Sequence, residues 1–399
     1  MSFLTELLSC RTAPFREHFA EERLKIELDH HRIPSFKDPH GNVVVGAGSS
    51  AEYLRILKRG SASAPTRFFI AHMDHPGFHI AGSGSGLRLE ATWHGGTPVE
   101  HLESAEVWLK CRDLPNWEGR GRIRSAMKAV HGRSVANSQI EISEPLPSSV
   151  NALSLFGGFR FQAPCWEEAG CVRGSVCDDL VGCFAIIETA KKVFTKGKAR
   201  AGFAPFLGLL SRAEEVGFVG TIAHLELGWI KKSRIPPLVV SLETSRALLP
   251  GAEIGKGPVV RLGDKFTVFS PGPTRALTEL AAKILPEKHQ RRIMDGGTCE
   301  GSAATVFGLP TIALSVPLGN YHNQSFEGGT GSLGSLGPAP EFVHLQDVAG
   351  LLALTSAIAK RAFRFDRPWE ATRTVYRQSL VKYRALLAPG ASRPKKPQK

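Results

Sequence analysis

The chain lacks any apolar run long enough to cross a membrane, since none of its stretches reaches about eighteen apolar residues. Its amino end, MSFLTELLSCRTAPFREHF, lacks the basic start and the long apolar core of a secretory signal. Cysteine is scarce and odd in number, with seven residues among 399, which favours reduced thiols over a disulfide framework. We therefore expect a cytoplasmic protein with no membrane partner.

Acidic residues are nearly missing from the carboxyl-terminal segment 360–399, which carries twelve Lys or Arg against Asp366 and Glu370. The net charge of the whole chain is +13, so about +3 remains for the rest. The basic charge is therefore local, and a solvated extra helix at 366–388 followed by a disordered tail at 389–399 accounts for it without a nucleic-acid partner. The chain also lacks a Gly-rich phosphate-binding loop with a Lys-Ser/Thr ending, which argues against a nucleotide enzyme.

The chain does contain an alternation of helical and strand-like segments. Buried strands are predicted at "FFIA" (residues 68–71), "APFLGLLS", "PPLVVSLE" and "PTIALSVP", with amphipathic helices between them. This order predicts an α/β body whose mixed, mostly parallel sheet is covered by helices on both faces. Residues 85–168 instead show short alternating segments separated by Gly and Pro, which predicts a small β domain. We expect this domain to interrupt a catalytic body formed by residues 1–84 and 169–365.

Metal-capable side chains follow the ends of these strands. His72 and Asp74 lie two residues apart, so they can share one face, and a carboxylate is a common support for a ligating imidazole. The carboxyl ends of parallel strands meet at one edge of a sheet, so the remaining groups are expected beside this pair. They are Asp178 and Asp179, Glu214 and Glu215, Glu243, and His322.

Two histidines and several carboxylates suffice for two divalent ions, with Asp178 able to bridge them. Imidazole and carboxylate ligands without thiolate favour zinc, with cobalt or manganese as alternatives. A second glutamate beside a ligand glutamate suits a general base for a metal-bound water. Simpler interpretations exist for each motif alone: Asp178 and Asp179 can cap a helix, and Glu pairs are usually solvated.

The ordered series of motifs resembles a known family, the co-catalytic dimetal aminopeptidases that include glutamyl aminopeptidase and the tetrahedral aminopeptidases. The resemblance covers roughly residues 3–363 and rests on "DPHGN", "AHMDHPGF", a β insertion, "CDDLVGC", "RAEEVGFVG", "SLETS", "GGTCEGSAA" and "YHN". It implies the zinc-peptidase α/β fold with an inserted small β-barrel. It also implies removal of amino-terminal residues from peptides through a metal-bridging hydroxide.

Carried over residue by residue, the resemblance gives each side chain a role. His72 and Glu243 would bind one ion, Glu215 and His322 the other, and Asp178 would bridge them. Glu214 would be the general base, and Asp74 would support His72. The resemblance also implies substrate contacts at Thr298, Tyr321 and, from the insertion, His131, although a surface histidine explains His131 equally well. The peptide bond between Asp178 and Asp179 would be cis.

Three motifs depart from the family pattern. Glu243 stands where an aspartate is usual, Cys299 replaces the acid of the "GGTDA" run and is followed by Glu300, and Tyr321 directly precedes His322, where relatives usually have one residue between them. These departures leave open a dimetal deacylase or carboxypeptidase of related architecture. A non-catalytic relative that binds polyanions through its basic carboxyl terminus is the alternative of another class. Relatives assemble through the insertion, so a homo-oligomer is expected.

Overall fold

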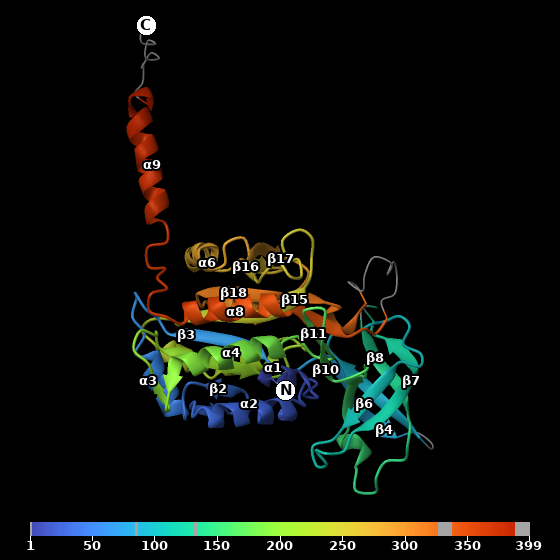
Figure 1. Ribbon diagram of the computed structural model, residues 1–399. Coiled ribbons are helices and arrows are strands. Elements are labelled where there is room, and N and C mark those ends of the chain that lie inside the picture. Colours follow the sequence, from blue (N-terminus) through green and yellow to red (C-terminus); the bar gives the residue numbers. More distant parts are fainter. Residues whose placement is uncertain (1, 84–86, 131, 133, 326–336, 388–399) are drawn as a thin grey trace.

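The computed structural model describes residues 2–83, 87–130, 132, 134–325 and 337–387 of the chain (Figure 1). A large sheet covered by helices forms the body, and a small closed barrel lies beside it. The predicted disordered tail at 389–399 and His131 lie outside the described residues. Within the described residues, no helix combines the length and the apolar character needed to span a bilayer.

In the described part of the chain, the large sheet has eleven strands. Nine form the path β1-β2-β14-β3-β15-β18-β19-β11-β10, and β16 and β17 branch from β18. Their bounds, in path order, are Ser35–Lys37, Val43–Val45, Phe206–Ser211, Arg67–His72, Leu238–Arg246, Thr311–Gly319, Glu341–His344, Cys171–Gly174 and Cys165–Glu168, with Val259–Asp264 and Gln290–Met294 for β16 and β17.

The centre of this sheet is parallel. Strand β3 pairs in parallel with β14 and β15, and β15 pairs in parallel with β18. Most outer pairs are antiparallel, including β1 with β2 and β19 with β11. The predicted mixed sheet is therefore confirmed, but its parallel pairs lie mainly at the centre and do not form most of the sheet.

Helices cover both faces of the sheet. The body helices are α1 (Phe3–Leu8), α2 (His18–His30), α3 (Ser50–Leu57), α4 (Leu180–Val193), α5 (Val219–Glu226), α6 (Pro271–Ile284), α7 (Glu300–Val306) and α8 (Leu345–Ile358). Successive side chains of a strand point to opposite faces. Phe69 and Ala71 of β3 accordingly pack in the core that α1, α2, α4 and α8 share. Phe68 and Ile70 pack in the second core, with α3, α5 and α7.

The insertion is a closed six-stranded barrel in the order β4-β5-β8-β7-β6-β9. Its strands are Gly77–Ser83, Arg88–His94, Val135–Ile142, Gly119–Lys128, Glu106–Lys110 and Phe156–Phe159. The barrel has its own apolar core. Its first strand begins at Gly77, earlier than the domain limit of 85 that composition suggested, because β3 runs into β4 through the short turn that carries Asp74.

The carboxyl-terminal helix α9 (Glu370–Tyr383) projects away from the body, and a short 3-10 turn, Arg384–Leu387, follows it. The segment that precedes α9 is anchored by Arg67, which lies fully buried in β3. The Arg67 guanidinium donates to the carbonyl oxygens of Ile358 at 3.0 Å and Phe363 at 2.7 Å. The end of α8 is therefore anchored to the sheet, whereas α9 has no buried residue.

Candidate metal centre

Four parallel strands deliver the candidate side chains to one edge of the sheet. His72 is the last residue of β3, Glu243 lies within β15, and His322 follows β18 in a short turn. Glu214 and Glu215 follow β14. Since the four strands run parallel, their carboxyl ends meet at this edge, as expected for a site in an open α/β sheet.

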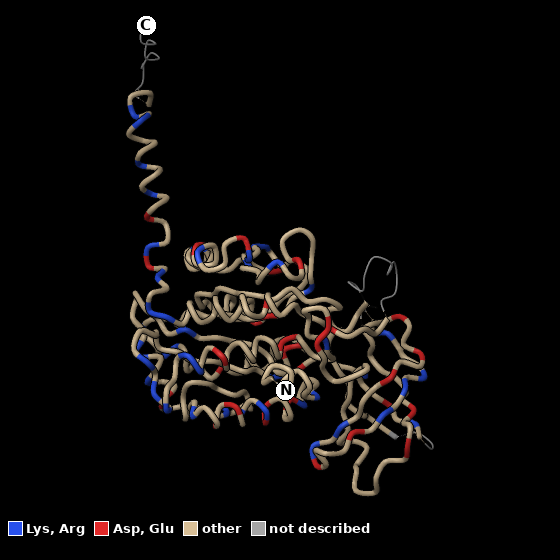
Figure 2. Tube along the Cα trace, in the orientation of Figure 1, with Lys and Arg blue, Asp and Glu red and all other residues tan. Residues whose placement is uncertain are grey.

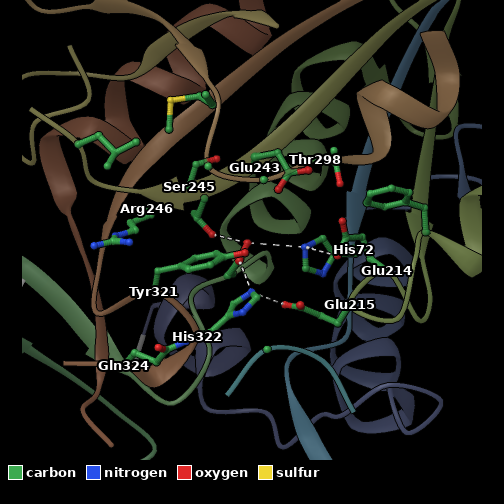
Figure 3. Close-up of a pocket in the computed structure, with 18 of the residues that line it drawn as sticks. His72, Glu214, Glu215, Glu243, Ser245, Arg246, Thr298, Tyr321, His322 and Gln324 are labelled. Carbon is green, nitrogen blue, oxygen red and sulfur yellow. Dashed lines mark hydrogen bonds and ion pairs between the residues drawn. The ribbon is translucent and has the colours of Figure 1, made fainter. Parts of the chain in front are cut away.

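The structure brings all five predicted ligands together, as Figure 3 shows for four of them. His72, Asp178 and Glu243 form one group whose potential ligand atoms lie within 4.8 Å of one another, and Asp178, Glu215 and His322 form a second. Asp178 is the shared member of these two groups. His72, Glu214 and Glu215 form a third group by the same measure.

Asp178 occupies the position between the two histidines. Its Oδ1 lies 3.6 Å from Nε2 of His72, and its Oδ2 lies 3.7 Å from Nε2 of His322. The Thr244 hydroxyl donates to Oδ1 at 2.9 Å and fixes the carboxylate plane. The peptide bond from Asp178 to Asp179 is cis, as the resemblance implied.

The donor set fits divalent cations. Glu243 is buried, and its Oε1 has no hydrogen-bond donor among the described residues. Burial raises the pKa of Glu243 to about 8, with further contributions from the charges of Asp178 and Glu300 and against the opposing charges of Arg261 and His72. Buried carboxylates whose charge is not balanced by protein groups are stabilised by a metal ion. The residues present therefore suit the divalent metal ions that the sequence predicted for this site.

Glu214 and Glu215 are held through their backbone. The N–H groups of Glu214 and Glu215 donate to the two carboxylate oxygens of Asp74 at 2.9 and 3.1 Å. The preceding N–H of Ala213 donates to Glu17 at 3.1 Å, and that of Arg212 donates to the Asn42 side chain at 3.1 Å. Four consecutive amides of this loop are thus bound by three buried side chains from distant segments.

The support of His72 differs from the predicted one. Its Nδ1 lies 3.1 Å from the backbone oxygen of Asp74 and 3.8 Å from the carboxylate of the same residue. The carboxylate is engaged by the loop after β14, so the backbone oxygen is the nearer acceptor for the imidazole. Asp74 therefore contacts both the ligand histidine and the loop that carries Glu214.

Sequence reasoning missed Glu341, a fully buried residue at the start of β19. Its Oε2 accepts the N–H groups of Cys177 at 2.7 Å and Asp178 at 3.1 Å, and its Oε1 accepts the N–H of His322 at 2.8 Å. One carboxylate thus orients two candidate ligands from separate segments. A glutamate in an apolar strand, in "PAPEFVHL", was the signal that could have identified it.

A cavity of about 720 Å³ opens over the site, and Thr298 and Tyr321 line it together with the candidate ligands. Tyr321 stacks on His322, with ring centroids 3.7 Å apart. Arg261 also lines the cavity although only 3% of its surface is exposed. Its Nη1 lies 3.4 Å from the Ser245 hydroxyl, and its Nε has no acceptor among the described residues.

Known proteins resemble this chain at the level of both family and fold. A sequence model of the M42 glutamyl aminopeptidases matches residues 53–326. The TET1 peptidase of Pyrococcus horikoshii, which can assemble into a tetrahedron or a large octahedral shell, superimposes with a TM-score of 0.68 at 21% identity over 90% of this chain and 98% of that one. An aminopeptidase from the archaeon Desulfurococcus kamchatkensis gives a TM-score of 0.69 at 18% identity, over 90% and 95%. No curated protein sequence matches the chain.

The fold and the cluster of histidines and carboxylates define a metallopeptidase. Because the family match covers more than half of the residues, the chain belongs to the M42 glutamyl aminopeptidase family. It is therefore a metallo-aminopeptidase, and the deacylase, carboxypeptidase and non-catalytic alternatives are not favoured.

Proposed function

We propose that His72 and Glu243 hold one divalent ion, that Glu215 and His322 hold a second, and that Asp178 bridges them. The observation that carries this proposal is the pair of ligand groups that share Asp178. Zinc suits the mixture of imidazole and carboxylate donors best, with cobalt and manganese as alternatives. Bound there, two such ions would lower the pKa of a water molecule and polarise a substrate carbonyl.

Glu214 is the proposed general base. Its carboxylate lies beside the ligand groups, with Oε2 3.9 Å from Nε2 of His72, and it is buried. Burial raises the pKa of Glu214 well above its ordinary value, and the neighbouring Glu215 and Glu243 add to this effect against the charge of His72. A carboxylate with a raised pKa takes a proton from the attacking water more readily and can then donate it to the leaving nitrogen.

The cavity supports a preference for acidic amino-terminal residues. Arg261 lies on the wall of this cavity. Burial disfavours the charge of the Arg261 guanidinium, but the nearby Cys299, Glu243 and Asp264 raise its pKa, so the guanidinium is charged. A charged guanidinium on the cavity wall favours a carboxylate ligand, because the two form charge-assisted hydrogen bonds. A glutamyl or aspartyl side chain of the substrate supplies that carboxylate.

Glu214→Gln is the experiment that tests the catalytic proposal. The variant should bind the same number of metal ions, and its kcat should fall about a thousandfold. General-base catalysis typically contributes about 10²- to 10⁴-fold to the rate. Full activity in this variant would overturn the role of Glu214. A substrate panel of amino-acid amides, acetylated amino acids and blocked dipeptides should show cleavage of the amides alone.

We also propose that the chain forms a homo-oligomer, with the barrel as a contact surface. The structural relative from Pyrococcus horikoshii can assemble into a tetrahedron or a large octahedral shell, and the barrel lies beside the sheet with its own core. Deletion of the barrel would remove β4 and disturb the adjoining turn that carries Asp74, so point changes on the exposed surface of the barrel are the suitable test. Zinc as the cellular ion and a cytoplasmic location stay predictions.

A further inference from the structure

The carboxyl-terminal helix α9 presents apolar side chains that no described residue covers. Val375, Tyr376, Leu380 and Tyr383 are between 50% and 70% exposed, and the following turn adds Leu386 and Leu387. The helix extends away from the sheet and the barrel, so its sides are open along its length (Figure 1). Its base is anchored, because the Arg275 guanidinium lies 5.2 Å from the ring centroid of Trp369 and Arg275 also donates to the carbonyl of Pro368.

These apolar residues share one broad face. With about 100° of rotation per residue, Val375, Tyr383, Tyr376 and Leu380 fall within an arc of about 140°, together with the small polar Thr372 and Ser379. A coiled-coil seam occupies a narrower stripe of two positions in seven. A face of this width suits a flat apolar layer better than a single partner helix.

Basic residues border this face on both sides. Arg373 and Arg377 follow Leu380 around the helix on one side, and Lys382 lies next to Val375 on the other. Figure 2 shows Lys and Arg positions spaced along the projecting helix. Glu370, at its first residue, is the only acidic residue of α9, and the sequence beyond it, 388–399, carries Arg393, Lys395, Lys396 and Lys399 with no acidic residue.

We propose that α9 binds an anionic lipid surface, with its apolar face in the interfacial layer and its basic borders on the lipid headgroups. A helix that lies in the plane of a membrane combines a polar, Lys- and Arg-rich face with aromatic and aliphatic residues on the other. Long basic side chains at the border can cover apolar surface while their charges stay in water. The proposal is independent of the catalytic site and differs from the expectation, based on sequence, of no membrane partner.

Two other occupants fit the residues less well. A second α9 would bring arginines against arginines, since no acidic side chain borders the apolar face. Nucleic acid would use the basic charge but leave the tyrosines and leucines of a broad face in water, and phosphate contacts alone do not need them. The lipid surface uses both features of the helix.

Sedimentation of the full chain with vesicles tests the proposal. Binding is expected to vesicles of phosphatidylcholine with about a third of phosphatidylserine, and not to phosphatidylcholine alone. Each basic residue near such a surface contributes roughly a fivefold gain in affinity, so the combined change of Arg373, Arg377 and Lys382 to Gln should weaken binding by about a hundredfold. High salt should weaken it as well.

Two neighbouring positions form a matched pair. Leu380→Ser removes an apolar side chain from the proposed contact face and should weaken vesicle binding by about tenfold. Val381→Ser makes a similar change at a 78% exposed position on the opposite side of the helix and should leave binding unchanged. Both variants should keep the aminopeptidase activity, because α9 lies outside the catalytic cavity.

Equal binding by wild type and Leu380→Ser, or equal loss in the two serine variants, would show that the proposed face makes no lipid contact. A wild-type chain that ignores anionic vesicles would also overturn the proposal. In that case, an assembly of Leu380→Ser that is smaller than the wild-type assembly in light scattering would show that α9 contacts a second copy of the chain. Salt-sensitive RNA binding by both serine variants would assign it to nucleic acid.

Discussion

The carboxylate of Asp74 accepts the backbone N–H of Glu214 at 2.9 Å, so the turn after β3 holds the proposed general base in place. The same carboxylate accepts the N–H of Glu215. Both glutamates depend on one buried acid whose own chain segment also contacts His72. A shift of Asp74 would therefore move His72 and Glu215, one ligand of each proposed metal ion, together with the proposed base Glu214.

Asp74→Asn should therefore impair catalysis more than folding. The asparagine oxygen can accept one of the two N–H groups, but its amide nitrogen faces the other donor, and the loop must shift. We expect a loss of about 10- to 100-fold in kcat, the range typical of groups that orient metal ligands. Steady-state kinetics and circular dichroism measure the two effects. Asp74→Ala with undiminished kcat would contradict this role.

Glu341→Gln should weaken metal binding. The side-chain amide would present an N–H group toward at least one of the three backbone donors, which displaces Asp178 or His322. Competition with a chelator should show affinity lower by about 10- to 100-fold. Glu22→Gln, an exposed change of the same kind on α2, is the control and should leave affinity unaltered. An equal effect of the two changes would rule out a specific function of Glu341.

Arg261→Met should change substrate preference. Methionine keeps an apolar stem of similar reach but removes the charge that pairs with an acidic substrate. We expect kcat/KM for glutamyl amides to fall by about 100-fold, within the range for a lost charged hydrogen bond, and that for leucyl amides to change far less. Arg291→Gln, on the exposed surface of β17, should alter neither. A parallel loss on both substrates would point to damage of the metal centre instead.

Metal removal should lower thermal stability as well as activity. The buried carboxylates repel one another without cations, and a ligand that binds the folded state alone at a hundredfold excess over its Kd stabilises it by about 2.7 kcal/mol. Dialysis against a chelator should lower the Tm, and added zinc should restore it along with activity. A Tm that does not respond to metal would argue against ions at these buried acids.

Glu27→Gln should lower stability in a pH-dependent manner. Burial opposes the charge of Glu27, but its ion pairs with Lys191 and Arg23 lower its pKa from 4.5 to about 2. A depressed pKa in the folded state stabilises the fold above about pH 4.5, and this contribution is lost as the pH falls toward 2. After allowance for solvent screening we expect a cost of about 1 kcal/mol at pH 7. Urea unfolding at pH 7 and pH 3 measures it; an equal cost at both would exclude the ion pairs as its source.

Much of the fold could be predicted because its signals are local. The buried strands β3, β14, β15 and β18 are continuous apolar runs, and their alternation with amphipathic helices indicates a parallel centre. The barrel was predicted as a separate β domain from its short alternating segments, but its first strand was not recognised. Gly77–Ser83 follows β3 almost directly, so composition changes only after the barrel has begun.

The candidate ligands were also visible in the sequence, since each lies at the end of a predicted strand or at the start of a helix. The groups that hold them were not predicted. Glu17, Asn42 and Glu341 come from a helix start, a turn and an outer strand, and their contacts at the site join positions separated by as much as 196 residues.

The sequence by itself determined the class of fold, the strands that end at one edge, and the residue types available to bind metal, because periodicity and side-chain chemistry are properties of short segments. Only the tertiary structure decided that the carboxylate of Asp74 serves the Glu214 loop, that Arg261 is a buried charge on the cavity wall, and that α9 stands uncovered. Each of these depends on which distant atoms come within hydrogen-bond distance or leave a surface open. Local pattern carries no information about such distances.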